Sequence, residues 1–176
     1  GDGDVQWLTA GDGINHAEMF PLLNQDGPNP IDFFQLWMNL PKADKRVKPY
    51  FSMFWANEVP QLSLTDPDGR KTEVTVVAGT IAGRTAPSPP PNSWASRPGS
   101  DVALLTVRME PNAAWSLPAA KAGTNRAVYV VTGGGLQVGG RTVPASTMPV
   151  PVVTAVTTER FGDCERVRGW RGGGEG

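Results

Sequence analysis

Short apolar runs, each closed by a turn-forming residue, follow one another along most of the chain. In several of them apolar and polar residues alternate, which is the period of a half-buried β-strand. Glycine, proline and aspartate separate the runs, and this spacing of short strands is typical of a barrel or a sandwich. We therefore predict an all-β fold with strands at Val5–Thr9, 14–20, 32–40, 50–55, Gln61–Thr65, Lys71–Ala78, 102–109, 113–117, 127–132, Leu136–Val138 and Arg141–Val143.

The connections between these runs carry local signals of their own. The sequence Asp-Pro-Asp-Gly at 66–69 predicts a hairpin turn, because proline presets φ and glycine supplies a positive φ. Residues 43–47 are expected to form a short helical turn. The proline-rich stretch 85–94 is expected to be irregular or polyproline II, as an excursion between strands or, alternatively, as a segment that a partner recognises.

The chain has one histidine, His16, and a glutamate two residues later, Glu18. Gly11 and Gly13 predict a turn over 10–13, so that 14–20 begins a new strand. On a strand the period of two places His16 and Glu18 on one face. An imidazole and a carboxylate side by side are half of a typical non-haem iron site. The alternative is a structural or solvated histidine without a ligand role.

The composition bounds the class of protein. A chain of 176 residues suffices for one large domain or two small ones. The formal net charge of −1 gives no sign of direct nucleic-acid or membrane binding. A single cysteine, Cys164, excludes an intramolecular disulfide and fits a reducing compartment, so we expect a cytoplasmic protein. We expect neither a membrane span nor a signal peptide.

Three blocks in order carry a resemblance to a known family. They are QWLTAGDGINHAEMF at 6–20, FFQLWMNLPKADK at 33–45 and DVALLTVRMEPNAAWSLPAAKAGTNRAVYVVTGGG at 101–135. Together they resemble the pirin family of the cupin superfamily. The resemblance implies a cupin-type double β-barrel (a bicupin) that is incomplete at both ends. The expected parts are the end of a metal-binding first barrel at 1–60, a metal-free second barrel at 61–156, and a disordered glycine- and arginine-rich tail at 157–176.

The resemblance also implies a site. In pirins, iron in the first barrel is held by an upstream His-x-His pair and by a His-x-Glu pair similar to His16 and Glu18. The upstream pair is absent from this sequence. In the second half the cupin metal motif aligns with Ala120, Ala122 and Arg126, which offer a metal no lone pair. The implied metal ligands are therefore His16, as a neutral imidazole, and Glu18.

Two functions follow from the resemblance. The first is an iron-dependent dioxygenase of the quercetin 2,3-dioxygenase type, in which Glu18 also takes a proton from a flavonol; this chain is expected to be impaired because the upstream pair is absent. The second is a non-enzymatic, iron-dependent regulatory protein that acts through a protein partner, in the nucleus if the source is eukaryotic. A third interpretation is a partly folded fragment whose exposed strand edges associate with another chain.

Overall fold

The computed structural model describes residues 3–144 and 165–169 of the 176-residue chain. Within these residues the regular structure comprises eleven β-strands and two short 3₁₀ helices, without an α-helix, which confirms the predicted all-β class. In chain order the elements are β1 (Val5–Thr9), η1 (Lys42–Asp44), β2 (Tyr50–Phe54), β3 (Gln61–Thr65), β4 (Lys71–Ala78), β5 (Thr80–Ile81), β6 (Arg84–Thr85), η2 (Trp94–Ser96), β7 (Leu104–Met109), β8 (Ala114–Leu117), β9 (Leu136–Val138), β10 (Arg141–Val143) and β11 (Glu165–Gly169).

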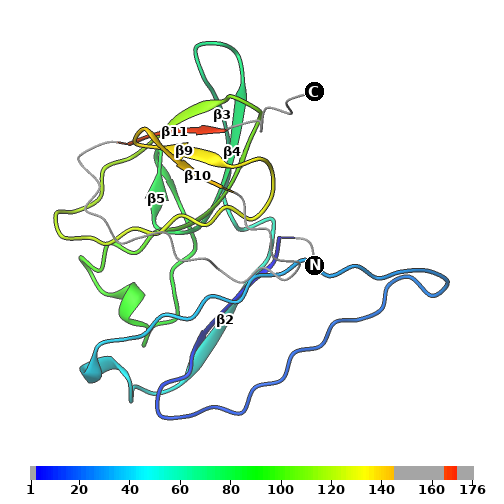
Figure 1. Cartoon of the computed structure of the whole chain (residues 1–176). Coiled ribbons are helices and arrows are strands. Elements are labelled where there is room, and N and C mark those ends of the chain that lie inside the picture. Colours follow the sequence, from blue (N-terminus) through cyan, green and yellow to red (C-terminus); the bar gives the residue numbers. More distant parts are fainter. Residues whose placement is uncertain (1–2, 145–164, 170–176) are drawn as a thin grey trace.

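The described strands form four antiparallel sheets (Figure 1). β1 pairs with β2, and β5 pairs with β6. The central sheet has the order β3-β4-β7, and a fourth sheet has the order β10-β9-β11-β8. As Figure 1 shows, the segment between β1 and β2 runs out as a long loop, away from the central sheet.

The central sheet forms because the turn at 66–69 joins β3 to β4 and because buried and exposed residues alternate along β4. Along β4 the side chains of Thr72, Val74, Val76 and Ala78 are buried, whereas Lys71 and Glu73 are exposed. The Gly69 N–H donates to the Asp66 carbonyl over 3.0 Å and closes the turn. Gly69 has φ +82°, which a residue with a Cβ adopts only with strain, so the sequence at 66–69 fixes the hairpin register.

Two apolar clusters form the core. One groups Val74, Val76, Ile81 and Ala86, with Leu62, Leu64, Leu105 and Trp115 packed around them. The other groups Trp7, Phe54, Val59 and Ala78, with Val5, Met38, Ala95, Val102 and Leu104 packed around them. The cluster around Trp7 thus draws residues from both sides of position 60, where the sequence suggested a boundary between two barrels. That boundary stays a prediction.

Several predicted strands are present with the bounds expected from the sequence. β1, β3, β4, β9 and β10 match the predicted ranges, and β2, β7 and β8 differ only at their ends. The proline-rich stretch 85–94 is irregular apart from the end of β6 at Thr85 and the start of η2 at Trp94, as predicted. The helical turn expected at 43–47 occurs as η1 together with the turn that follows it.

Three predicted strands are wrong. Residues 14–20, 32–40 and 127–132 have no regular secondary structure. A strand requires a hydrogen-bonded neighbour, and none of these three segments pairs with another strand of the described chain. The apolar residues of these segments therefore suit a sheet, although none of the described strands pairs with them.

The end of the chain lies largely outside the described residues, including Cys164 and most of the tail predicted at 157–176. The described part of that tail is Glu165–Gly169, which forms β11 and pairs antiparallel with β8 and with β9. The described part of the chain contains no helix with the length and apolarity that crossing a bilayer requires.

Candidate functional site

A narrow neck leads from β1 into the segment that carries the candidate ligands. After Thr9 the chain turns at 10–13, where the Gly13 N–H donates to the Ala10 carbonyl over 3.0 Å. The Asp12 N–H donates to the Val47 carbonyl over 3.1 Å, so the outgoing and returning chains meet here. Gly11 has φ +55°, and a Cβ at this position would collide with the Val47 carbonyl. Glycine at 11 is therefore what lets the neck close.

His16 and Glu18 lie just beyond this neck and contact each other. His16 Nε2 lies 3.0 Å from Glu18 Oε1, and the two side chains are 31% and 35% exposed. The sequence predicted that these side chains would lie side by side on a strand. They are side by side, but the segment 14–20 is not in a sheet. Their assignment as metal ligands stays a prediction.

The chemistry of the pair fits a non-haem iron, but the number of donors is too small. A neutral imidazole nitrogen and a carboxylate oxygen are the two ligand types of the 2-His-1-carboxylate iron centre, which needs at least three protein donors. Within residues 3–144 and 165–169, no group of three or more His, Cys, Asp or Glu side chains is close enough to hold a metal. The described residues therefore offer two of the at least three donors that such a centre needs, and no reaction step through iron follows from them.

Two of the second-half positions that align with cupin ligands, Ala122 and Arg126, lie in or close to a hydrogen-bonded turn. Arg126 donates from its guanidinium to the Pro118 carbonyl. The Asp101 carboxylate accepts from the Lys121 N–H over 2.7 Å and from Thr124 Oγ1 over 3.1 Å. These contacts organise the turn at 121–124, which contains one of the two alanines at the aligned histidine positions.

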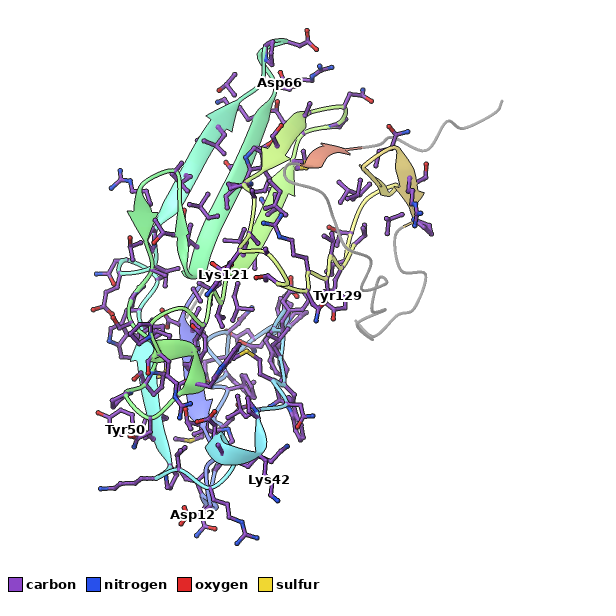
Figure 2. The ribbon with its side chains drawn as sticks, turned by 90° about the vertical axis from the view of Figure 1, so that its left-hand side faces the viewer. Asp12, Lys42, Tyr50, Asp66, Lys121 and Tyr129 are labelled. Carbon is purple, nitrogen blue, oxygen red and sulfur yellow. The ribbon has the colours of Figure 1, made fainter. Side chains whose placement is uncertain are left out.

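One buried carboxylate was not singled out by the sequence. Asp66, at the end of the molecule opposite Asp12 in Figure 2, has a side chain only 1% exposed. Its oxygens accept from the backbone N–H groups of Asp68, Arg70 and Ala114 and from Arg70 Nε, all within 2.9–3.0 Å. Burial opposes ionisation, but the hydrogen bonds from Arg70 and Ala114 and the Arg70 charge outweigh it and lower the pKa of Asp66 to about 2. The sequence feature that indicates this role is an aspartate at the first position of a turn, where its carboxylate accepts hydrogen bonds from nearby backbone N–H groups.

A second buried carboxylate joins two loops. Asp44, at the end of η1, is 1% exposed and pairs with the guanidinium of Arg97, just after η2. Asn92 Nδ2 also donates to the Lys48 carbonyl over 3.1 Å. Together these contacts fasten the proline-rich excursion to the loop before β2. The spacing of residues in the sequence does not predict either contact, because the two partners lie about fifty positions apart in the chain.

The loop that carries the candidate ligands has large apolar side chains that the described residues do not cover. Met19 is 94% exposed and Trp37 is 87% exposed. The rings of Phe20 and Phe33 pack together with centroids 5.4 Å apart. Beside them the tip of the loop encloses a hollow of about 310 Å³ lined by Phe20, Pro21, Leu22, Leu23, Asn24, Pro28, Asn29, Pro30 and Ile31. The candidate ligands thus project from a segment rich in exposed apolar surface.

Comparisons with known proteins find matches to the part of the chain that carries the candidate ligands. The pirin family model matches residues 1–38, the range that contains His16 and Glu18. The chain is related to the pirins. It is 40% identical over 81 residues to human pirin and 38% identical over 82 residues to a pirin-like protein of Solanum lycopersicum. It is also 37% identical over 79 residues to a Pseudomonas aeruginosa protein provisionally named as a quercetin 2,3-dioxygenase.

These matches to pirins cover parts of each protein. They take in 45% to 47% of this chain and 24% to 27% of the human, tomato and Pseudomonas proteins. The chain therefore spans about a quarter of the length of these curated relatives. No solved structure gives a significant match. The predicted relationship to pirins is confirmed, and an all-β chain is what the cupin class of that family requires.

Proposed function

We propose that this chain is part of a pirin-like iron protein and that His16 and Glu18 supply two of the iron ligands. The observation that carries the proposal is the contact between His16 Nε2 and Glu18 Oε1, 3.0 Å apart on an exposed segment. This pair lies within the range that the pirin family model matches. Its donor types are those that iron takes in non-haem oxygenases.

The proposed reaction of the intact protein is the oxidation of a flavonol by dioxygen, as the name of the Pseudomonas relative suggests. Iron, when bound, would supply the redox and Lewis-acid chemistry. The part that this chain contributes is a base: the Glu18 carboxylate accepts the proton of a flavonol hydroxyl. His16, in contact with Glu18, positions the carboxylate and supplies a nitrogen donor.

We further propose that the isolated chain holds iron weakly, because a third donor is absent from the described residues. The test is the iron content of the purified chain after anaerobic loading with Fe²⁺ and desalting. We expect iron well below one ion per chain, and a further fall to background in His16→Ala. The matched control is Asp26→Ala, another exposed acid of the same loop, which should leave the iron content unchanged. Equal iron in His16→Ala and the unaltered chain would contradict the ligand assignment.

Quercetin consumption under air, with added Fe²⁺, tests the reaction separately. Turnover at the rate of an intact pirin would contradict the proposed impairment. Because Glu18 is also a proposed ligand, the iron content of Glu18→Gln is measured with its turnover: turnover lost at an unchanged iron content would support the base, and turnover lost together with iron would support the ligand role alone.

The exposed apolar side chains support a second candidate function, an iron-dependent interaction protein without enzymatic activity. Side chains such as Met19, Leu23 and Trp37 are mostly exposed, which is typical of a surface that binds another protein. In this case iron would bind, and quercetin would neither bind nor be consumed. Any iron-dependent consumption of quercetin, even at a low rate, would therefore favour the first candidate over the second.

A further inference from the structure

Charge is distributed unevenly along the first part of the chain. Residues 1–41 contain six acidic residues and neither lysine nor arginine. Residues 42–48, which we call the basic block, read KADKRVK and contain four basic residues and one acidic residue. Because the whole chain has a formal net charge of −1, the chain outside the basic block has a net charge of −4. A local excess of positive charge in an otherwise anionic chain attracts ligands of negative charge.

The fold turns the one acid of the basic block inward. Asp44, at the end of η1, is 1% exposed, and its carboxylate pairs with the guanidinium of Arg97. This pairing offsets the charge of the carboxylate, which would otherwise oppose its burial. The four basic residues of the block are all exposed: Lys42, Lys45, Arg46 and Lys48. The exposed surface of the block therefore carries positive charge without a compensating acid of its own.

Contacts with distant parts of the chain hold the backbone of the basic block in place. The Val47 carbonyl accepts from the Asp12 N–H over 3.1 Å, and the Lys48 carbonyl accepts from Asn92 Nδ2 over 3.1 Å. Together with the pair of Asp44 and Arg97, these hydrogen bonds fix the block near both of its ends. A surface that is fixed before binding loses less conformational entropy when a ligand binds. The four charges are therefore presented as one preorganised surface.

The surroundings of the basic block favour a protein ligand over a nucleic acid. Figure 2 shows Lys42, Tyr50 and Asp12 at one end of the molecule, with Asp66 at the other. Tyr50 is 47% exposed, and tyrosine and arginine are enriched where proteins contact each other. A nucleic acid is charged along its whole length, so it would extend past the exposed Asp12 and over a chain that is otherwise anionic. An acidic peptide can confine its charge to the block.

We propose that the basic block binds an acidic segment of a partner protein, whose carboxylates face the four basic side chains. Charge complementarity gives the contact its specificity and speeds the encounter. The exposed ring of Tyr50, just after the block, supplies apolar contact area. Binding of this kind needs neither iron nor the pair His16 and Glu18, so it goes beyond the proposed function and stands or fails independently of it.

Fluorescence anisotropy of a labelled polyglutamate peptide, as long as the basic block, measures the binding to the full chain. Lys45 is left unaltered, because its Nζ donates to Asn39 Oδ1. The block variant combines Lys42→Ala, Arg46→Ala and Lys48→Ala, and the control combines Lys71→Ala, Arg84→Ala and Arg108→Ala, which are exposed basic residues of β4, β6 and β7. Each exposed charge pair contributes a small factor to the affinity, so the block variant should bind about tenfold more weakly. The control should bind as the unaltered chain does.

Equal weakening in the block variant and the control would show that overall charge attracts the peptide, and would overturn the proposal. Failure of the unaltered chain to bind would also overturn it. Binding should weaken strongly between about 0.01 M and about 1 M salt, because the screening length falls from about 30 Å to about 3 Å. Oligothymidylate with the same number of charges, or vesicles of phosphatidylserine, should compete poorly. Tighter binding of either one would overturn the assignment to a protein partner.

Asn92→Ala tests whether the basic block must be held in place, because it removes the contact with the Lys48 carbonyl without changing any charge. We expect binding to weaken about two- to tenfold, the cost of ordering a side chain or a short segment. Asp44→Asn is a second variant, for which charge alone predicts tighter binding and loss of the Arg97 contact predicts weaker binding. Tighter binding in Asp44→Asn, together with unchanged binding in Asn92→Ala, would overturn the preorganised surface.

Discussion

The central sheet and the loop between β1 and β2 have similar apolar patterns but opposite surroundings. In the sheet, Val74 and Val76 are at most 1% exposed, because β4 has a neighbour on each side. In the loop, residues 32–40 carry large apolar side chains on both faces of the predicted strand, but Leu36 is 51% exposed and Trp37 is 87% exposed. Among the described residues, no strand pairs with 32–40.

The difference between these two regions separates two requirements for a β-strand. The sequence of a strand makes its side chains suitable for a two-sided, apolar environment. Formation of the strand also requires another segment whose N–H and C=O groups pair with its own. The loop meets the first requirement and not the second. Consequently, substitutions in the central sheet should affect stability strongly, and equivalent substitutions in the loop should not.

The largest effect is expected for Val76→Ala in β4. Val76 is completely buried, so the substitution removes two carbon atoms and leaves a cavity. The expected loss of stability is about 2 to 3 kcal/mol. Urea unfolding followed by tryptophan fluorescence measures it. A loss below about 0.5 kcal/mol, the range of ordinary surface substitutions, would contradict the packing described for this cluster.

The next effect is expected for Arg97→Ala, which removes the partner of the buried Asp44 carboxylate. An unpaired buried acceptor is destabilising, and the half-exposed Arg97 moderates the loss, so we expect about 1 to 2 kcal/mol. Because this pair fastens the proline-rich excursion, limited proteolysis should also cut within 85–94 more rapidly. Arg108→Ala, an exposed arginine of β7, is the control and should change neither measurement.

A smaller effect, which disappears in acid, is expected for Asp66→Asn. The pKa of Asp66 is lowered from 3.8 to about 2 in the folded protein. A carboxyl group whose pKa is lower in the folded protein stabilises the fold at pH values above its pKa in the unfolded chain. This contribution is lost as the pH falls from about 4 to about 2. The difference in unfolding free energy between the unaltered chain and the variant should therefore narrow over that range. A difference that stays constant from pH 6 to pH 2 would show that Asp66 does not ionise as described.

The smallest effect is expected for Trp37→Ala in the loop. Despite the size of the side chain, its 87% exposure means that little contact is lost. The expected change is within about 0.5 kcal/mol. If the loop is instead covered in solution, the same substitution should destabilise the protein or change its mass. Urea unfolding and light scattering at two protein concentrations distinguish these outcomes.

The sequence predicted the strands whose partners are close by in the chain. β3 and β4 are joined by the turn at 66–69, and β9 and β10 by a two-residue turn, so local alternation and turn residues were sufficient. Residues 14–20 and 32–40 were assigned to strands for the same local reasons. That prediction was wrong because pairing depends on residues far away, which a local pattern does not report.

The candidate site was predicted in part. The approach of His16 to Glu18 follows from their separation of two positions in an extended chain, and the contact is present. The sequence did not predict the roles of Asp44, Asp66 and Asp101. Asp66 and Asp101 accept hydrogen bonds from residues 20 or more positions away, and Asp44 forms an ion pair with the equally distant Arg97. Such contacts depend on how the loops fold over the sheets, and single residues give no periodic signal for them.

The neck at Gly11 has a consequence for how the loop can vary in length. β1 and β2 keep their register up to the pair Thr9 and Tyr50, and the Asp12 N–H to Val47 carbonyl bond fixes the chain just beyond it. The entropy lost on closing a flexible loop grows only with the logarithm of its length, so doubling the loop costs about 0.6 kcal/mol. Insertions and deletions near the tip at 22–30 should therefore be tolerated. Relatives of this chain are free to differ most in length where the loop is farthest from its neck.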